Sequence, residues 1–424
     1  MPIPTAVHER TFPLCSSLNY REWAGYYAPS SYEVTPEHEY NAIRQAAALI
    51  DVTPLYKYTL RGPDATRLVN RVITRDINKV AVGQVIYCCW CDEQGHVIDD
   101  GTITRLAENE YRWTAAEPNL RWFSQNAIGY DVEIHDISRE VAALSLQGPT
   151  SGRLLKRVLT ASAPDFVASA KTAQAQQAEL ANTKYFRMMR ASIAGIPVDI
   201  SRTGYTGDLG YEIWVAWNDA VKVWDALTSV GREFDLHPAG MLALDMVRIE
   251  AGLILLDVDY TSSKRALIPL QRYTPYEIGL GKLVDLKKLA FVGREALVEE
   301  DRRGPRRKLV GLEIHWPDVE RIFAEQDLAP QAPTVASRVH VPIFVSRGGT
   351  KGALGHRQVG RATSTTWSPT LKKMIALASV SSEHANVGTK LEMEYTVEAV
   401  RRTVGVTVVK TPFFNPARKT AVPV

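Results

Sequence analysis

The order of hydrophobic and polar positions predicts a chain that mixes helices with strands. Residues 37–50 end in an apolar stretch at helical spacing and predict a helix, and residues 55–60 predict a strand. Further strands are predicted at 85–91, 97–103, 111–115 and 141–146, with helices at 151–159, 221–230 and 242–251. Beyond residue 308, short alternating runs separated by turns indicate a compact β-rich region.

Three other stretches bear on how the chain is divided. A charged run at 299–307 (EEDRRGPRR) predicts a linker, so we expect one region at 1–303 and another at 308–424. An insert rich in Ala, Gln and Ser at 161–182 is either a helix or an excursion from the fold. A glycine-rich run at 349–355 fits no phosphate-binding pattern and is interpreted as a plain turn.

The composition is that of a folded globular chain and excludes several classes. The 424 residues are 45% hydrophobic and 23% charged, and the net charge is +3. A balance this even argues against binding nucleic acid or an anionic membrane through bulk charge. The sequence shows neither the ~18-residue apolar run of a membrane span nor a signal-peptide pattern. We therefore expect a cytoplasmic protein with no nucleic-acid or membrane partner.

The cysteines indicate packing in a reducing compartment. Three of the four, Cys88, Cys89 and Cys91, fall within one predicted strand, too close together for a disulfide framework. A zinc site needs ligands on flexible loops and a second pair elsewhere, whereas the remaining cysteine, Cys15, is distant in the sequence. The nine histidines show no ligand spacing either, so no metal is expected.

Two adjacent acids stand in an otherwise apolar strand at 95–101 (GHVIDDG). Because side chains alternate along a strand, Asp99 and Asp100 should point to opposite faces, and one of them inward or into a cleft. A buried carboxylate must be hydrogen-bonded or used. The sequence leaves open whether the inward acid is structural or works in a reaction.

The most unusual stretch is 202–212 (RTGYTGDLGYE), which contains three closely spaced glycines. Such spacing implies a bent backbone or a close approach to a ligand. Its tyrosines and Glu212 offer a stacking surface and a carboxylate, which would suit a flat heterocycle with an amide-like edge. The alternative is a decorated hairpin without a ligand.

Taken in order, these motifs resemble the tetrahydrofolate-dependent aminomethyltransferase family, whose best-known member is the T-protein of the glycine cleavage system. The similarity spans most of the chain. Its strongest part is 202–212, which matches the family motif almost letter for letter. The supporting motifs are Asp51-Val52, 61–65 (RGPDA), the hairpin with Tyr87 and Asp99-Asp100, 146–149 (LQGP) and 248–252 (RIEAG). The resemblance implies an α+β fold: a three-part ring that holds folate, with a C-terminal β-barrel-like domain.

The resemblance also implies roles for particular residues. Asp100 corresponds to the aspartate near folate N5 and N10, where it would orient the donor, balance positive charge or help a proton move. Glu212 corresponds to the carboxylate that hydrogen-bonds the amino-pyrimidine edge of the pterin. The remaining cofactor-binding candidates are Tyr87, Tyr205, Leu55, Thr114 and Arg248.

Several positions depart from the T-protein pattern. T-proteins usually read Ser-His-Met where this chain has Thr53-Pro54-Leu55, and they favour an asparagine at the position of Thr114. They also have an arginine where this chain has Leu244. Losing a cation from a largely apolar site would leave any anion that it paired with uncompensated. These changes favour a relative with a different donor.

The resemblance therefore implies an enzyme, a folate-dependent demethylase that moves a one-carbon unit from a small O-, N- or S-methylated substrate to tetrahydrofolate. One alternative is the aminomethyl transfer of the glycine cleavage system, which would add a lipoyl carrier protein as partner. The other is a folate-binding protein without catalysis. A flavin-fused relative is not expected, because the sequence has no dinucleotide fingerprint.

Overall fold

The computed structural model describes residues 1–159, 172–346 and 356–421. The glycine-rich run 349–355 and positions 161–171 of the insert lie outside the described residues. The chain divides into two units, one made of Met1–Cys88, Asp99–Leu244 and Asn415–Val424, the other of Cys89–Ile98 and Asp245–Phe414. Across the described ranges, every helix is too short or too polar to cross a membrane.

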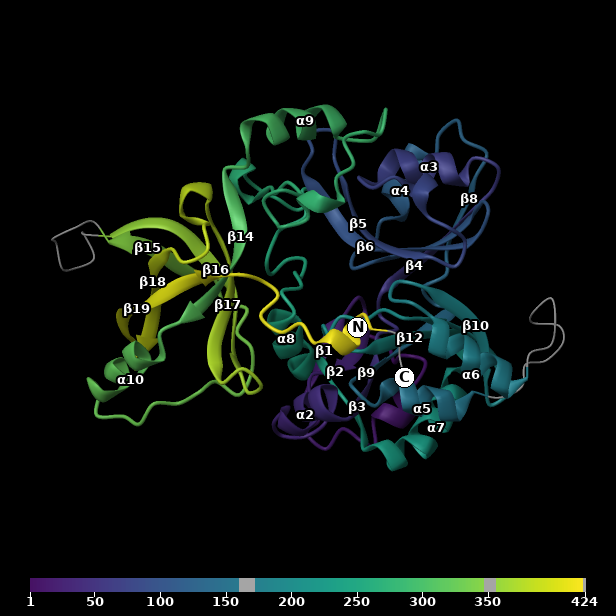
Figure 1. Cartoon of the computed structure of the whole chain (residues 1–424), viewed down its shortest axis with the longest axis horizontal. Coiled ribbons are helices and arrows are strands. Elements are labelled where there is room, and N and C mark those ends of the chain that lie inside the picture. Colours follow the sequence, from purple (N-terminus) through teal and green to yellow (C-terminus); the bar gives the residue numbers. More distant parts are fainter. Residues whose placement is uncertain (160–171, 347–355, 422–424) are drawn as a thin grey trace. The chain divides into compact units, whose positions relative to one another are not determined.

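The first unit contains a six-stranded sheet in the order β10-β11-β12-β9-β3-β13 (Figure 1). Neighbouring strands are antiparallel except for the parallel pair β13 and β3. The strands are β3 (Ala47–Asp51), β9 (Val141–Gln147), β10 (Met188–Ile193), β11 (Ile196–Ser201), β12 (Gly210–Ala216) and β13 (Leu236–Pro238). The nearby helices are α5 (Ser151–Val158), α6 (Ala173–Asn182) and α7 (Ala220–Gly231).

Helices α5 and α7 cover one face of this sheet. Leu144 of β9 packs in one buried apolar cluster with Leu154 of α5 and Trp224 of α7. Since side chains alternate along a strand, the neighbours Ser145 and Gln147 point to the opposite face, where they are also buried. The sheet therefore has an apolar face under helices and a second face that carries buried polar groups.

A five-stranded sheet in the order β5-β6-β7-β4-β8 follows the same plan. On one face, Phe123 packs against Trp113 and Tyr58 at ring-centroid distances of 4.2 and 5.3 Å. Alternation places Lys57 and Arg112 on the other face. The strands are β4 (Tyr56–Arg61), β5 (Val85–Cys91), β6 (Val97–Ala107), β7 (Glu110–Ala115) and β8 (Glu133–Asp136), with helices α3 (Ala65–Val72) and α4 (Leu120–Asn126).

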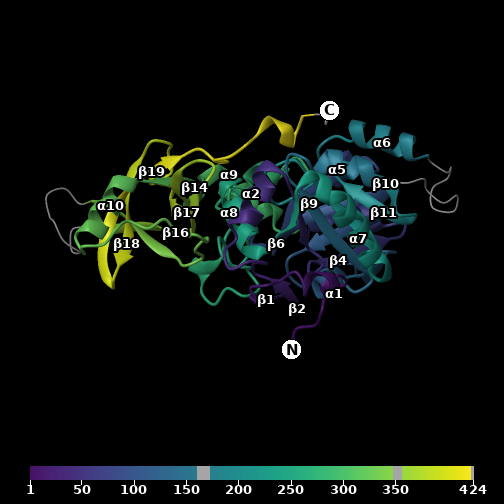
Figure 2. The ribbon, with the colours of Figure 1, turned by 90° about the horizontal axis from the view of Figure 1, so that it is seen from below.

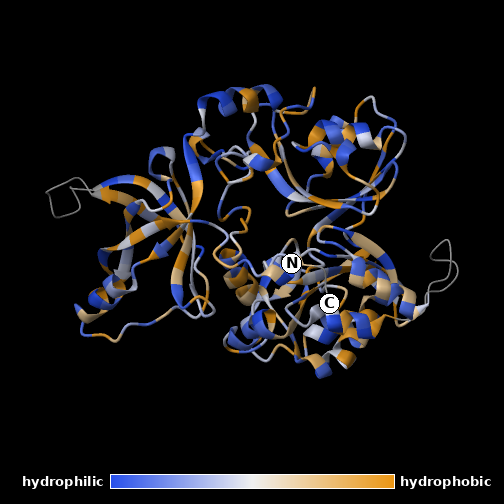
Figure 3. Ribbon diagram, in the orientation of Figure 1, coloured by the Kyte–Doolittle hydropathy of each residue, from blue (hydrophilic) through white to orange (hydrophobic). Residues whose placement is uncertain are grey.

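The second unit contains a closed barrel in the order β14-β17-β16-β15-β18-β19. Hydrophobic and hydrophilic segments alternate along its strands (Figure 3), as expected of side chains that point in and out in turn. Helix α10 (Trp316–Ala324) lies beside β18 and β19 (Figure 2) and adds Val319 and Ile322 to the barrel core. The strands are β14 (Arg307–Ile314), β15 (Val341–Ser346), β16 (His356–Ser368), β17 (Lys373–Ser381), β18 (Lys390–Val397) and β19 (Val400–Val409).

The remaining elements are four helices, a strand pair and several 3₁₀ turns among the described residues. The helices are α1 (His8–Thr11), α2 (Glu37–Gln45), α8 (Met241–Glu250) and α9 (Arg294–Arg303), and β1 (Tyr20–Trp23) pairs with β2 (Tyr26–Pro29). Single 3₁₀ turns occur at Ile77–Lys79, Trp217–Asp219, Arg232–Phe234, Pro269–Gln271, Gly281–Leu283, Ser382–His384 and Ala417–Lys419.

Two sequence interpretations are wrong in part. The helix predicted at 37–50 ends at Gln45, and its apolar second half is strand β3, buried throughout in the middle of a sheet. A short apolar run has no period that separates a buried strand from a buried helix. The charged run at 299–307 is mostly the end of α9, which stops at Gly304 with a φ of 83°. Its charges lie on a helix, and only residues 304–306 connect α9 to β14.

Candidate functional site

Asp100 and Tyr87 form a hydrogen-bonded pair on neighbouring strands. The Tyr87 hydroxyl on β5 donates to Asp100 Oδ2 on β6 at 2.6 Å, and both residues are half-buried. A hydroxyl that donates to a carboxylate favours its ionised form and restricts its rotation. Asp100 is therefore placed to hold negative charge at a fixed point without being sealed from a ligand.

Asp99 has different surroundings, as strand alternation predicts. Its side chain is fully buried and accepts hydrogen bonds from the backbone of Asp100 (2.8 Å) and Glu117 (3.1 Å) and from Asn119 Nδ2 (2.8 Å). Burial, and next the charge of Asp100, raise the pKa of Asp99 well above its usual value. Because its oxygens are occupied by protein donors, Asp99 is the structural member of the pair.

Thr114 lies on the same face of this sheet as Asp100. It stands opposite Thr102, two residues after Asp100, and the Thr102 and Thr114 hydroxyls are 2.6 Å apart. Thr114 Oγ1 also accepts a hydrogen bond from the Thr102 backbone N–H at 3.2 Å. Thr114 therefore presents a methyl group and a hydroxyl that is already hydrogen-bonded, whereas the asparagine favoured in T-proteins would present an amide.

Glu212, on β12, is held by a directed chain of hydrogen bonds. Trp214 Nε1 can only donate, and it donates to Ser201 Oγ at 3.2 Å. The Ser201 and Thr203 hydroxyls are 2.9 Å apart, and Thr203 Oγ1 donates to Glu212 Oε2 at 2.5 Å. Within the described residues Thr203 is the hydrogen-bond partner of this carboxylate, so Oε1 remains able to accept from a ligand.

The charge state of Glu212 reflects opposing effects. Burial raises its pKa above the usual value, whereas the Thr203 hydrogen bond and the positive charge of Arg112 lower it. A half-buried carboxylate with one unused oxygen can accept from a ligand that offers N–H donors.

The glycines of the 202–212 motif make room for a protein side chain. A Cβ atom on Gly204 or Gly210 would lie 2.2 or 2.1 Å from Gln147 Oε1. Gln147 is fully buried, and its Nε2 donates to Ser145 Oγ at 2.9 Å and to the Thr203 carbonyl at 3.3 Å. The sequence left open a bent backbone or a close approach to a ligand. Gly204 and Gly210 are explained by close approach, but the group that approaches them is the side chain of Gln147.

Leu55 lies half-buried in the turn that precedes β4, and Lys57 organises that turn. Lys57 Nζ donates to the carbonyls of Thr53 (2.7 Å) and Leu55 (2.6 Å), and the lysine is completely buried. Burial lowers the pKa of Lys57 to about 7. Tyr205 is half-buried in the connection between β11 and β12.

Arg248 belongs to the second unit, on α8, and its guanidinium is fully buried. Nη1 donates to Asp259 Oδ2 at 2.5 Å and Nη2 donates to Ser364 Oγ at 2.7 Å. Nε lies 3.4 Å from Asp245 Oδ1. A hydrogen bond from Arg248 to folate would require one of these protein contacts to break.

The first unit brings four of the other candidates onto two polar sheet faces that touch. Arg112 on β7 donates to Asp199 Oδ2 on β11 at 2.7 Å, which joins the five-stranded to the six-stranded sheet. Tyr87, Asp100 and Thr114 lie on the five-stranded sheet, and Glu212 lies on the six-stranded sheet.

Sequence reasoning missed Arg112 and Lys57. Each is a cation between two apolar residues of a strand, Tyr111 and Trp113 in one case and Tyr56 and Tyr58 in the other. In a strand whose neighbours are buried, a lone cation must lie on the opposite face. That signal was present, but the partners of these cations lie on other strands.

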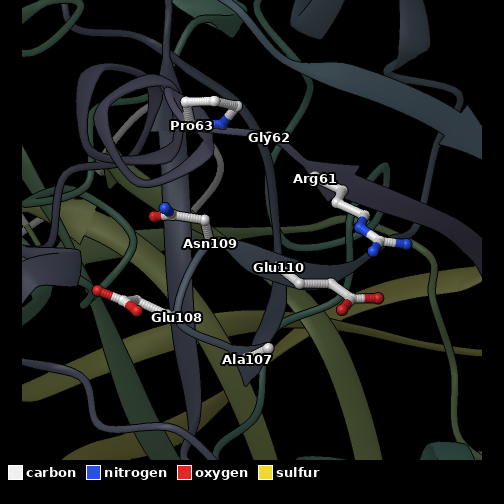
Figure 4. A pocket seen from close by; sticks show the side chains of 7 residues that line it. All are labelled: Arg61, Gly62, Pro63, Ala107, Glu108, Asn109 and Glu110. Atoms are coloured by element: carbon white, nitrogen blue, oxygen red, sulfur yellow. The ribbon is translucent and has the colours of Figure 1, made fainter.

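A hollow of about 400 Å³ lies elsewhere in the first unit, at the ends of β4 and β7 (Figure 4). It contains none of the predicted site residues. A Cβ atom on Gly62 would lie 2.6 Å from the Asp131 carbonyl oxygen, so close packing explains this glycine of the RGPDA motif. The residues that line the hollow are Arg61, Gly62, Pro63, Ala107, Glu108, Asn109 and Glu110.

Comparison with known proteins identifies the class of this fold and site. Residues 18–288 match the family described as the GCVT N-terminal domain, and residues 307–415 match the glycine cleavage T-protein C-terminal barrel domain. The chain therefore belongs to the GCVT family of folate-dependent aminomethyltransferases. It is a one-carbon transferase, and tetrahydrofolate is its cofactor.

Individual relatives agree with this assignment. An aminomethyltransferase of Bacillus cytotoxicus is 32% identical over 400 residues, which cover 93% of each chain. A trimethylamine-oxide aldolase of Ruegeria pomeroyi is 34% identical over 88% of this chain, which spans 43% of that protein. The crystal structure of aminomethyltransferase T of the glycine cleavage system from Bartonella henselae superposes with a TM-score of 0.77 at 21% identity, covering 98% and 99% of the two chains. It confirms the predicted α+β fold with a C-terminal barrel.

The polar groups of the first unit fit tetrahydrofolate. A pterin has a flat ring with an edge of N–H donors, and half-buried Glu212 supplies a carboxylate oxygen that is not used by the described residues. Tyr87 and Tyr205 are half-buried aromatic rings able to contact such a ring. Asp100 presents a half-buried carboxylate whose orientation the Tyr87 hydroxyl restricts.

Proposed function

We propose that this protein transfers a methyl group from a small O-, N- or S-methylated substrate to tetrahydrofolate. The observation that carries the proposal is the Asp100 carboxylate, which the Tyr87 hydroxyl fixes at 2.6 Å on the polar face of its sheet. Tetrahydrofolate, when bound, supplies the nitrogen that accepts the one-carbon unit.

The protein contributes position and charge in this proposal. Glu212 accepts from the pterin edge through its free oxygen, and the hydrogen bond from Thr203 keeps it in place. The donor heteroatom keeps the electron pair of the broken bond to the methyl group, and Asp100 accepts the proton that the folate nitrogen would lose. Asp100 also stabilises positive charge that develops during the transfer, while Tyr87 holds the orientation of its carboxylate. Holding two reactants in register removes much of the entropy barrier to their reaction, so no covalent protein intermediate is required.

The altered pocket supports a small donor. The Thr114 hydroxyl is hydrogen-bonded to the Thr102 hydroxyl. Residue 244 is a buried leucine where T-proteins carry an arginine. Fewer polar groups remain to hold a charged aminomethyl carrier arm. The relative named trimethylamine-oxide aldolase has a small N-methylated substrate in its name, which lends support to this substrate class.

The second candidate is the aminomethyl transfer of the glycine cleavage system, with a lipoyl carrier protein as partner. It is favoured by the relatives named aminomethyltransferase, which match this chain over 93% of its length. A folate-binding protein without catalysis is the third candidate, and it predicts that Asp100 can be replaced without consequence.

The proposal is tested by incubating the purified protein and tetrahydrofolate with methylated amines, ethers and sulfonium compounds, then analysing the folate by mass. We expect 5-methyl-tetrahydrofolate with one class of donor. A parallel reaction contains an aminomethyl-loaded lipoyl carrier protein in place of the panel. Turnover only with the carrier would support the second candidate, and folate binding with no turnover in either reaction would support the third.

We also propose a folate-binding region at 1–303 and a barrel-like domain at 308–424, supported by the end of α9 at Arg303 and the start of β14 at Arg307. A cytoplasmic location is proposed as well. It is supported by four thiols that are all free, those of Cys15, Cys88, Cys89 and Cys91.

A further inference from the structure

Arg112 is a buried cation with unused hydrogen-bond donors. The residue is 5% exposed, and its guanidinium lies 4.5 Å from the ring centroid of Trp214. Nη1 is paired with Asp199, but among the residues that the structure describes Nε and Nη2 have no hydrogen-bond partner. A buried charged donor without a partner is costly, so these N–H groups are expected to meet a ligand or ordered water.

The ion pair with Asp199 does not account for this arrangement. Asp199 is also approached by Arg190, whose Nε lies 3.8 Å from Oδ1 and whose side chain is 47% exposed. An arginine placed only to join two sheets could point its free N–H groups at backbone carbonyls or solvent. Arg112 is instead pinned between Asp199 and the Trp214 ring, which fixes the plane of its guanidinium.

The free donors of Arg112 lie in the neighbourhood of Glu212. Trp214, on which Arg112 stacks, is two residues after Glu212 on β12, so both side chains share one face of the sheet. Burial first, and then the Thr203 hydrogen bond and the Arg112 charge, set the pKa of Glu212. An unused acceptor and unused donors therefore lie close together on contacting sheets.

We propose that Arg112 is a pterin-binding residue that donates to the ring carbonyl next to the N–H groups read by Glu212. The inference rests on the proposed folate-dependent function. A pterin edge presents N–H donors beside a carbonyl acceptor, and the pair of Glu212 and Arg112 presents the complementary acceptor and donors. Arg112 thus supplies a cation on β7 in a chain that carries leucine at position 244.

The test compares the affinities of two ligands for the unaltered protein and for Arg112→Met, measured by calorimetry without turnover. Two ligands are compared: tetrahydrofolate, and its 4-amino analogue, in which an amino group replaces the ring carbonyl. Arg112→Met should weaken tetrahydrofolate binding about 10- to 100-fold, as expected for a charge-assisted hydrogen bond, and should weaken the analogue less than about 3-fold.

Three further variants separate ligand binding from folding. Arg190→Met removes the exposed arginine from the same carboxylate and should leave both affinities unchanged. Asp199→Asn weakens the ion pair but keeps the donors of Arg112, so it should cost less affinity than Arg112→Met. Arg112→Lys keeps the charge opposite Asp199 but loses the planar fork, so it should fold and still bind tetrahydrofolate about 10-fold more weakly.

Equal losses for the two ligands would overturn the contact with the carbonyl. Unchanged tetrahydrofolate affinity in folded Arg112→Met and Arg112→Lys would overturn the inference alone. Failure of the unaltered protein to bind tetrahydrofolate would overturn both the inference and the proposed function.

Discussion

The buried Lys57 gives a stability prediction whose size follows from the structure. Its ammonium donates to two backbone carbonyls, but its side chain is completely buried, and burial lowers its pKa from 10.5 to about 7. Lys57→Met removes the charge and keeps a side chain of similar length. At a single pH, the difference in free energy of unfolding between the two proteins combines two effects, removal of the buried charge and loss of the two hydrogen bonds. The change of that difference with pH reports the charge alone.

Between pH 7 and pH 9 the folded protein has largely lost the Lys57 proton, while the unfolded chain still holds it. The unfolded state therefore binds more protons, and stability rises with pH over this window. Below pH 7 the lysine is charged in both states, so the full cost of burying it remains. From pH 7 to pH 9 the unaltered protein should gain about 2 kcal/mol relative to Lys57→Met.

The assay is chemical denaturation followed by tryptophan fluorescence at pH 7, 8 and 9, with the difference in free energy of unfolding taken at each pH. Lys222→Met is the matched control, because the Lys222 side chain is 69% exposed and should produce no such slope. The burial argument would be refuted if the difference in free energy of unfolding between the unaltered protein and Lys57→Met changed by less than about 0.5 kcal/mol from pH 7 to pH 9.

Three further predictions concern the site. Asp100→Asn should lower kcat at least about 100-fold while leaving Tm and folate affinity nearly unchanged, because it removes charge without changing shape; near-normal kcat would remove Asp100 from the mechanism. Glu212→Gln should raise the Kd for tetrahydrofolate about 10-fold and change the rate at saturation much less, and an unaltered Kd by calorimetry would contradict its role. Gly204→Ala should destabilise the protein by about 1–3 kcal/mol in thermal unfolding, since its Cβ would overlap Gln147, and an unchanged Tm would show that Gln147 can move aside.

Local patterns were sufficient for much of the fold. The alternation of the strand at 97–103 separated Asp99 from Asp100, and the structure buries the first and leaves the second half-buried. The apolar spacing at 151–159 predicted a helix, and α5 spans Ser151–Val158 with Leu154 and Leu155 fully buried. In such cases the immediate neighbours carry the whole signal.

Features that depend on distant pairing were not predictable from one sequence. Strand β3 is buried because it lies between β9 and β13, which come about 90 and 190 positions later, so its apolar run was taken for helix. Gln147 explains Gly204 and Gly210 only once β12 is paired with β9. Arg112 likewise acquires meaning only when β7 is brought against β11, 87 residues further on. The family resemblance supplied the candidates at the site, but their contacts required the structure.

The central claim is folate-dependent methyl transfer with Asp100 at the reacting centre. The most direct measurement uses a donor from the methylated panel whose methyl carbon is ¹³C-labelled, with mass analysis of the folate after reaction with the unaltered protein and with Asp100→Asn. The account predicts labelled 5-methyl-tetrahydrofolate with the unaltered protein and almost none with Asp100→Asn, although both bind tetrahydrofolate equally. Equal labelling with both proteins, or no labelling with any donor despite tight folate binding, would contradict it.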